Sequence, residues 1–451
     1  MRVFLKNVSA VWVMNLVNGV LGIVFVPIAV HRLGASGYGL FSIYTVLASY
    51  VALTDLGIGT NLQRILAGRG KGDGGGDDAW RREQVQTAWG FYLLLCAALL
   101  LLLIALVRVV PDYLFPVSAD SRRAVQWITV LAVLDFVLGV PALLMQNTAA
   151  AAERFDRYSR FGLTSGLVRY TLMFAGVLLT RRPEVLVAVI TARRLIDVPL
   201  ALAITGGLPP GAWRPRFAKA PFLEFLRGTS LLSLAQLLQV SIIALPAMLV
   251  NWFFGIRPLG VYRATFDLAS RVWFFSNTIG LVLFPKFVRM LAAERERLQG
   301  MLPRLLSFSW MAYAALGLLG ALAGPTVLRL FGLRGPEFAA LFVVLIAALS
   351  WNAHATTAYA FTLAAGRSAR AVVLGALGLT LLVATFFVTR SAGAGLLAIA
   401  WSWAVSQLIY AFVADISALR ILGVPVRPVE DLVMRVAAAA AVSLVVLRPY
   451  V

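Results

Sequence analysis

The chain has 451 residues, of which 61% are hydrophobic and 13% are charged, and its mean hydropathy is +0.86. A soluble domain is about half apolar and about a quarter charged, so this composition excludes a soluble globular protein and predicts a polytopic membrane protein. The formal net charge is +20, and nearly all the basic residues are Arg. That excess fits either cytoplasmic loops facing anionic lipids or an anionic substrate.

Apolar runs of about 20 residues, the length that crosses a bilayer, recur along the chain. They predict spans near residues 8–30, 40–64, 85–108, 125–150, 161–180, 185–205, 229–253, 262–288, 304–328, 338–364, 371–389 and 396–416. We therefore expect an all-α membrane protein with 12–13 transmembrane helices in two six-helix lobes, residues 1–206 and 207–425. A weaker, Ala-rich run at 432–447 leaves open an extra membrane helix within residues 426–451.

The orientation follows from Lys and Arg in the connections between spans. With the N-terminus inside, the cytoplasmic connections carry twice as many basic residues as the outer ones. This bias predicts a multi-pass protein with a cytoplasmic N-terminus. The N-terminal apolar run is about a full span long and is expected to be retained rather than cleaved.

An internal repeat relates the two predicted lobes. Gly34 and Gly39 recur as Gly255 and Gly260 at the same shift of 221 residues (255 − 34 and 260 − 39). At that shift LGASGYGLF aligns with FGIRPLGVY, and two amide pairs with i,i+3 spacing also align, Asn15 and Asn18 with Gln236 and Gln239. The repeat predicts two parallel lobes related by a pseudo-two-fold axis along the membrane normal.

Several short motifs resemble a known transporter family. They are Lys6-Asn7, Pro27, LGxxxYG at 33–39, Asp55-Leu56-Gly57, Arg64, GxxxxGxY at 255–262 and Phe284-Pro285. Together they resemble the lipid-linked oligosaccharide flippases, the polysaccharide-biosynthesis proteins of the multidrug/oligosaccharidyl-lipid/polysaccharide exporter superfamily. A thirteenth span would give an odd number of spans, whereas members of that family usually have twelve or fourteen.

The resemblance implies a V-shaped transporter that works by alternating access. It would move a polyprenyl-pyrophosphate-linked oligosaccharide from the cytoplasmic to the outer leaflet of the bacterial plasma (inner) membrane, for cell-surface polysaccharide synthesis. The implied partners are that glycolipid, the lipid bilayer and, as candidates, glycosyltransferases or a polymerase of the same pathway. No cofactor, metal or nucleic acid is expected.

Charged residues inside the predicted spans are the first candidates for a substrate site. An arginine in a span costs about 2.5–3.5 kcal/mol unless a partner or water offsets it. Arg193 and Asp197 are spaced i,i+4, and Arg263, Asp267 and Arg271 follow one another at four-residue steps on one predicted helix face. A guanidinium matches phosphate oxygens bidentately, so this interior favours a phosphate-bearing substrate. The expected charged contacts are Asp55, Arg169, Arg193, Asp267 and Arg271.

Two alternatives stay open for these side chains. The arginines, Arg194 included, can instead pair with Asp55 or Asp135 across helices and lock the fold. The amides Asn15, Asn18, Gln236 and Gln239 are expected to contact the glycan, but amides between helices also act as interhelical hydrogen bonds. His354 is expected to make a satisfied polar contact rather than to relay protons.

Two other functions compete with the flippase. A multidrug or cation antiporter of the same fold would need an acidic cavity, whereas the in-span arginines here outnumber the evident acids. A polytopic glycan polymerase would need a substantial outer loop for its catalytic groups, and the predicted outer loops are short. The sequence therefore predicts a transporter and not an enzyme.

Overall fold

The computed structural model describes residues 2–53, 62, 66, 76–152, 154–208, 211–217 and 219–425, and these residues form helices and loops without a β-strand. Asp55 and the segment 426–451 lie outside the described residues. The chain forms two compact units, each taken by itself below: unit 1 is Met1–Phe25 with Arg32–Val240, and unit 2 is Val26–His31 with Ser241–Val451. Whether segments 1–206 and 207–425 move as lobes stays a prediction.

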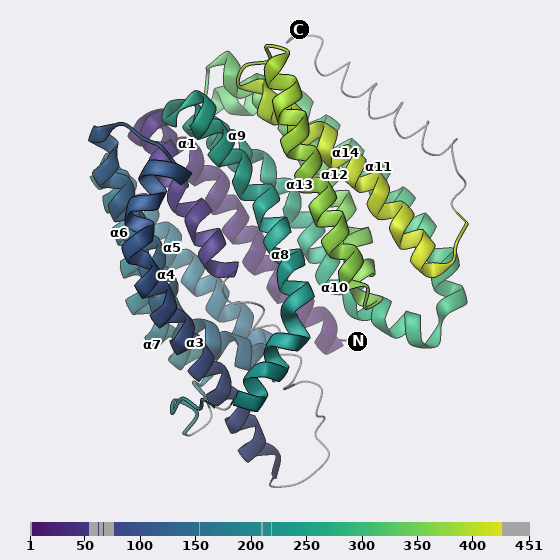
Figure 1. The fold of residues 1–451 in the computed structure, drawn as a ribbon. Helices are drawn as coiled ribbons and strands as arrows, with labels where there is room; N and C mark the ends of the chain where they lie inside the picture. Colours follow the sequence, from purple (N-terminus) through teal and green to yellow (C-terminus); the bar gives the residue numbers. More distant parts are fainter. Residues whose placement is uncertain are drawn as a thin grey trace. The chain divides into compact units, whose positions relative to one another are not determined.

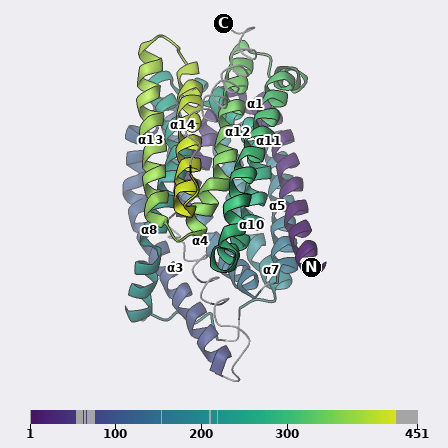
Figure 2. The ribbon, with the colours of Figure 1, turned by 90° about the vertical axis from the view of Figure 1, so that its right-hand side faces the viewer.

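Both units are bundles of helices (Figures 1 and 2), and in each unit one long helix contacts several others. In unit 1, α4 (Ala119–Ala151) packs against α3 (Gly76–Val109), α5 (Phe155–Leu179), α6 (Pro183–Ala192) and α7 (Arg194–Thr205). In unit 2, α12 (Pro336–Ala364) packs against α9 (Ile256–Ala269), α10 (Trp273–Ala293), α11 (Arg295–Leu330) and α14 (Leu397–Leu422). The remaining helices are α1 (Arg2–Leu53), α8 (Lys219–Phe254), α13 (Ser368–Ser391) and the one-turn π-helix η1 (Val110–Leu114).

Within the described residues, nine helices are long and apolar enough to cross a membrane. One of them, Val13–Val51, contains two of the expected spans in a single kinked helix. Two further expected spans are each divided in two, as α6 with α7 and as α9 with α10. The described residues therefore form a multi-pass, all-helical membrane protein, and the predicted span 40–64 lies outside them after residue 53 apart from single positions.

Gly34 and Gly255 break their helices in the same way. Gly34, within α1, has φ 72° and ψ 168°, and Gly255, between α8 and α9, has φ 90° and ψ −175°. This combination of positive φ and extended ψ is open essentially to glycine alone. Two positions 221 residues apart thus share a rare backbone conformation, which supports the internal repeat found in the sequence.

Replacing either glycine by Ala should destabilise the protein by about 1–3 kcal/mol through backbone strain alone. A Cβ at either position would meet nothing within 4 Å, so no steric clash contributes. Gly19→Ala is the matched control, because Gly19 lies in α1 with equally open space around it and helical backbone. A fall in apparent melting temperature in detergent is expected for Gly34→Ala and Gly255→Ala only. An equal effect of Gly19→Ala would contradict the strain argument.

The predicted span at 262–288 is wrong as one continuous helix. The α-helix α9 ends at Ala269, and a 3₁₀ turn, η2 (Ser270–Val272), precedes α10. Arg271 lies in that turn, so the four-residue periodicity that joins Arg263 to Asp267 does not continue to Arg271. The Ser270 hydroxyl donates to the Asp267 carbonyl at 3.1 Å, a local side-chain bond that competes with the helical pattern.

Candidate functional site

Two adjacent arginines stand where α6 ends and α7 begins. Arg193 is the single residue between the two helices, and Arg194 opens α7. Pro199 lies one turn further on and has no N–H for the carbonyl four residues before it, which weakens α7 near its start. This interruption places both guanidinium groups among α4, α5 and α7.

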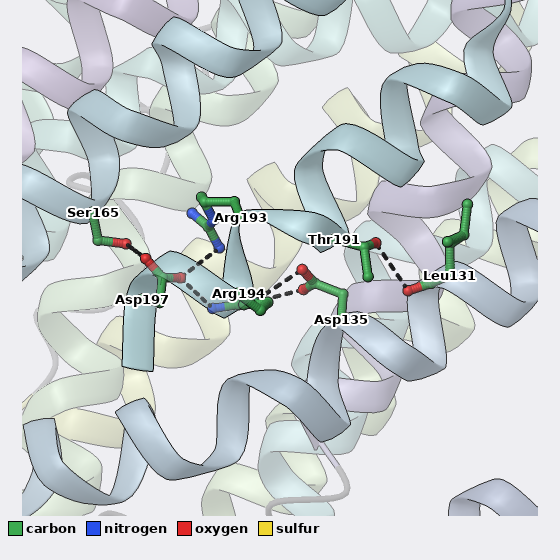
Figure 3. Close-up of polar contacts among 7 residues, drawn as sticks. All are labelled: Leu131, Asp135, Ser165, Thr191, Arg193, Arg194 and Asp197. Carbon is green, nitrogen blue, oxygen red and sulfur yellow. Dashed lines mark hydrogen bonds and ion pairs between the residues drawn. The ribbon is translucent and has the colours of Figure 1, made fainter. Parts of the chain in front are cut away.

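Arg194 forms two parallel hydrogen bonds with Asp135 of α4. Its Nε donates to Oδ1 at 2.9 Å and its Nη2 donates to Oδ2 at 2.7 Å (Figure 3). Gly139, one turn along α4 from Asp135, provides the space, since a Cβ there would lie 3.0 Å from the Arg194 Cζ. For Arg194 the structure therefore shows the alternative expected from the sequence, in which an in-span arginine pairs with Asp135 across helices.

Asp197 is the second acid, and its contacts join α7 to α5 and to the junction between α6 and α7. The Arg193 Nη2 lies 3.2 Å from its Oδ2, the Arg194 Nη1 lies 3.4 Å from the same oxygen, and the Ser165 hydroxyl of α5 donates to its Oδ1 at 2.8 Å (Figure 3). Only 1% of the Asp197 side chain is exposed. The ion pair predicted from the i,i+4 spacing of Arg193 and Asp197 is present.

The cluster holds more cations than anions. Arg169 of α5 is close enough to Arg193 for their charges to repel, and the group made of these two arginines, Arg194, Asp135 and Asp197 carries one net positive charge. The Nε atoms of Arg169 and Arg193 are buried and have no hydrogen-bond partner among the described residues. We call these five residues the arginine cluster: Asp135, Arg169, Arg193, Arg194 and Asp197.

The internal repeat identifies the residues of unit 2 that correspond to the arginine cluster of unit 1. Helix α4 begins at residue 119 and α12 at residue 336, a shift of 217 (336 − 119). Adding 213 to the residue numbers of α6 and α7 gives positions on α14, and buried residues of α6 and α7 correspond to buried residues of α14. The matched buried pairs are Leu186 and Ile399, Ile190 and Trp403, Asp197 and Tyr410, Ala201 and Ala414, and Thr205 and Ala418. The same shift relates α5 to α13, since the Ser165 contact with Asp197 corresponds to the packing of Gly378 on Tyr410.

Each member of the arginine cluster has an uncharged counterpart in unit 2. The counterparts of Asp135, Arg169, Arg193, Arg194 and Asp197 are, in that order, Asn352, Leu382, Ser406, Gln407 and Tyr410. Asn352 and Gln407 still form a bond across α12 and α14, from Nδ2 to Oε1 at 2.7 Å. The fold thus uses a polar bridge at this place in both units, but only unit 1 makes it from charges.

The other predicted site residues lie in separate places. Asn18 packs against Gly166 of α5, where a Cβ would lie 2.0 Å from its Oδ1, and Asn15 lies half-buried one turn away. Gln236 and Gln239 are half-buried on α8. The structure therefore does not assign a shared surface to the four amides, and their contact with a glycan stays a prediction.

Asp267 and Arg271 belong to unit 2. The Arg263 Nη2 lies 2.9 Å from the Asp267 Oδ1, so these two residues, which are four positions apart in the sequence, form an ion pair. Arg271 is half-buried, and its Nε has no hydrogen-bond partner among the described residues. Their role in substrate binding stays a prediction.

Unit 2 also contains a buried polar cluster that ties three helices together. His354 of α12 lies with Nε2 3.0 Å from the Asp415 Oδ2 on α14 and Nδ1 3.0 Å from the Ser309 hydroxyl on α11. The Trp310 indole N–H donates to the same Asp415 oxygen at 2.9 Å. His354 is fully buried and bonded at both ring nitrogens, as expected for a satisfied polar contact.

Comparison with known proteins gives the fold. No protein-family model and no curated protein matches the sequence. Among solved structures, an inward-facing multidrug resistance MATE family transporter of the MOP superfamily matches with a TM-score of 0.73 and 12% identity, over 91% of this chain and 98% of that one. The lipid II flippase MurJ in an inward closed conformation matches with a TM-score of 0.64 and 10% identity, over 97% and 98%.

A third similar structure is described by the polarity of its binding pocket. It is a MOP superfamily transporter from Pyrococcus furiosus whose binding pocket is described as having reverse polarity, with a TM-score of 0.61 and 12% identity over 93% of this chain and 96% of that one. All three proteins are transporters, and each matches over nearly its whole length. The chain has the fold that these structures share, and they include both MOP superfamily transporters and a lipid II flippase.

Proposed function

We propose that the chain flips a polyprenyl-pyrophosphate-linked oligosaccharide from the cytoplasmic to the outer leaflet of the bacterial plasma membrane by alternating access. The observation that carries the proposal is the arginine cluster. At the same five positions unit 2 has only uncharged residues, so the fold does not require charge there. Ionised groups inside a membrane are costly, and where packing does not need them a function is the default explanation.

The cluster supports an anion rather than a cation as the transported headgroup. Arg194 is held by two carboxylates, whereas the Nε atoms of Arg169 and Arg193 have no hydrogen-bond partner within the described part of the chain. Guanidinium donors pair bidentately with phosphate oxygens. Arg169 and Arg193 would therefore hold the pyrophosphate, with Asp135 and Asp197 fixing the positions of Arg194 and Arg193.

The remaining predicted contacts complete the proposal. Arg271, Asp267 and Asp55 would line the route of the headgroup, and Asn15, Asn18, Gln236 and Gln239 would contact the sugars. Orientation with the N-terminus in the cytoplasm, pathway enzymes as partners and cell-surface polysaccharide synthesis as the process are parts of the same proposal. A multidrug antiporter has the same fold, but a net positive cluster repels the organic cations that such a cavity would attract.

Transport by the purified protein in liposomes tests the proposal. The probe is a fluorescent short-chain polyprenyl-pyrophosphate disaccharide, and its matched control is the same glycolipid with an uncharged linker in place of the pyrophosphate. We expect protein-dependent flipping of the pyrophosphate probe and little flipping of the uncharged one. Equal flipping of both would show that the anion is not recognised, and flipping of neither would refute the proposed substrate class.

A further inference from the structure

Residues 211–217, between α7 and α8, are fastened to the start of α3; we call them the linker strap. Gln86 holds both ends of the strap, because its side-chain amide donates to the Gly211 carbonyl and its own carbonyl accepts from the Arg216 N–H, each at 3.0 Å. The Arg216 Nη1 also pairs with the Glu83 Oε1 at 2.9 Å. These contacts fix the strap against one turn of α3.

The inner side of the strap is packed as well. Ala212 is fully buried in an apolar cluster of unit 1, and the Trp213 ring meets the Trp89 ring edge-on with centroids 5.7 Å apart. A Cβ at Gly90 would lie 2.6 Å from the Arg216 carbonyl oxygen, so only glycine lets the two backbones come this close. The strap therefore has a defined shape and a defined outer surface.

The sequence of α3 indicates the depth of the strap in the membrane. After Glu83 the next charged residue of α3 is Arg108, so 24 residues, 84–107, carry no formal charge. In a helix that stretch is about 36 Å long, slightly more than the roughly 30 Å hydrocarbon core. The contacts of the strap with residues 83–90 thus place it where α3 leaves the hydrocarbon.

The outer surface of the strap combines aromatic rings with positive charge. Trp213 is 38% exposed and Phe217 is 62% exposed. Arg214 and the neighbouring Arg82 of α3 are exposed, while Arg216 is paired with Glu83. Aromatic rings beside arginines are typical of side chains that sit in a membrane interface and attract anionic headgroups.

We propose that the linker strap, with Arg82, is a binding site for anionic phospholipids of the surrounding leaflet. The rings of Trp213 and Phe217 would lie among the upper acyl chains while Arg82 and Arg214 contact the phosphates. Each interfacial arginine is worth about fivefold in local enrichment of anionic lipid. The site uses residues of unit 1 alone and is independent of the transported substrate.

Quenching of Trp213 fluorescence by brominated lipids tests this site. The protein is reconstituted into phosphatidylcholine vesicles that contain an equal, low fraction of either brominated phosphatidylglycerol or brominated phosphatidylcholine. The Trp213 contribution is the difference between the protein and its Trp213→Phe variant. We expect severalfold stronger quenching by the brominated anionic lipid, and we expect Arg82→Gln/Arg214→Gln to abolish that preference.

The matched control is Arg181→Gln/Arg182→Gln. These exposed arginines lie between α5 and α6, at the opposite end of unit 1, and the preference at Trp213 should survive their loss. Equal quenching by the two lipids, or loss of the preference in this control, would overturn the proposed specificity. Absence of quenching by either lipid would show that Trp213 does not lie in the membrane interface.

Discussion

Replacing Arg169 by Leu and Arg193 by Ser should reduce flipping of a pyrophosphate-linked substrate at least about a hundredfold, because each charge-assisted hydrogen bond contributes about 1.5–3 kcal/mol. Leu and Ser are the residues that unit 2 has at the corresponding positions, Leu382 and Ser406. Asp197 would keep the Ser165 hydroxyl and Arg194 as partners. The variant should therefore fold while it loses the donors that we propose for the phosphates.

The measurement is the initial flipping rate in liposomes at matched protein incorporation. Arg257→Ser, an exposed arginine of unit 2, is the control and should leave the rate unchanged. Arg169→Lys/Arg193→Lys should recover part of the rate, since an ammonium carries the charge but lacks the bidentate fork. A wild-type rate in the Leu/Ser variant would remove both arginines from the site.

Asp135→Asn alone should destabilise the protein by about 3–5 kcal/mol, the usual effect of leaving a buried charge without its partner. Arg194 would lose the charge of its partner and one of its two bonds to α4, because the Asn amide has a single acceptor oxygen and its NH2 group faces the guanidinium, while the 3.4 Å contact with Asp197 remains. Adding Arg194→Gln should restore most of the stability, because unit 2 bridges the corresponding helices with Asn352 and Gln407. The expected signature is therefore a double variant that is more stable than the single one.

Unfolding in detergent, followed by apparent melting temperature, measures this pair of variants. Asp112→Asn is the control, because Asp112 pairs with Arg122 at 2.9 Å but both side chains are substantially exposed. An exposed ion pair contributes about 0–1 kcal/mol, so this change should have little effect. If the double variant is as unstable as Asp135→Asn, the neutral pair of unit 2 is not an adequate replacement and the comparison between units fails.

Local spacing in the sequence indicates which charged residues four positions apart can pair. Arg193 with Asp197 and Arg263 with Asp267 follow from the i,i+4 rule, and both pairs are present. The bond between Asp135 and Arg194 joins residues 59 positions apart on different helices, which no periodicity reveals. The sequence indicates Asp135 only as one of two acids, with Asp55, that an in-span arginine can pair with.

The repeat was found from its most constrained residue. Gly34 and Gly255 share a conformation that few residues other than glycine adopt, so the 221-residue shift is visible in the sequence. The later helices follow shifts of 217 and 213, because their connecting loops differ in length between the units. A single shift therefore misses Asn352 and Gln407 as the counterparts of Asp135 and Arg194. The sequence also does not indicate the contact of Ser165 with Asp197, because a single hydroxyl in an apolar run can have many structural roles.

Side-by-side binding of an anion and a cation tests the proposed substrate polarity most directly. Purified protein is titrated with a short-chain polyprenyl pyrophosphate and with rhodamine 6G, and the titrations are repeated with Arg169→Leu/Arg193→Ser. We expect the wild-type protein to bind the pyrophosphate, to bind the cationic dye weakly or not at all, and to lose the pyrophosphate when the two arginines are neutralised. Tight binding of the dye by the wild-type protein without binding of the pyrophosphate would contradict the flippase and favour a multidrug transporter.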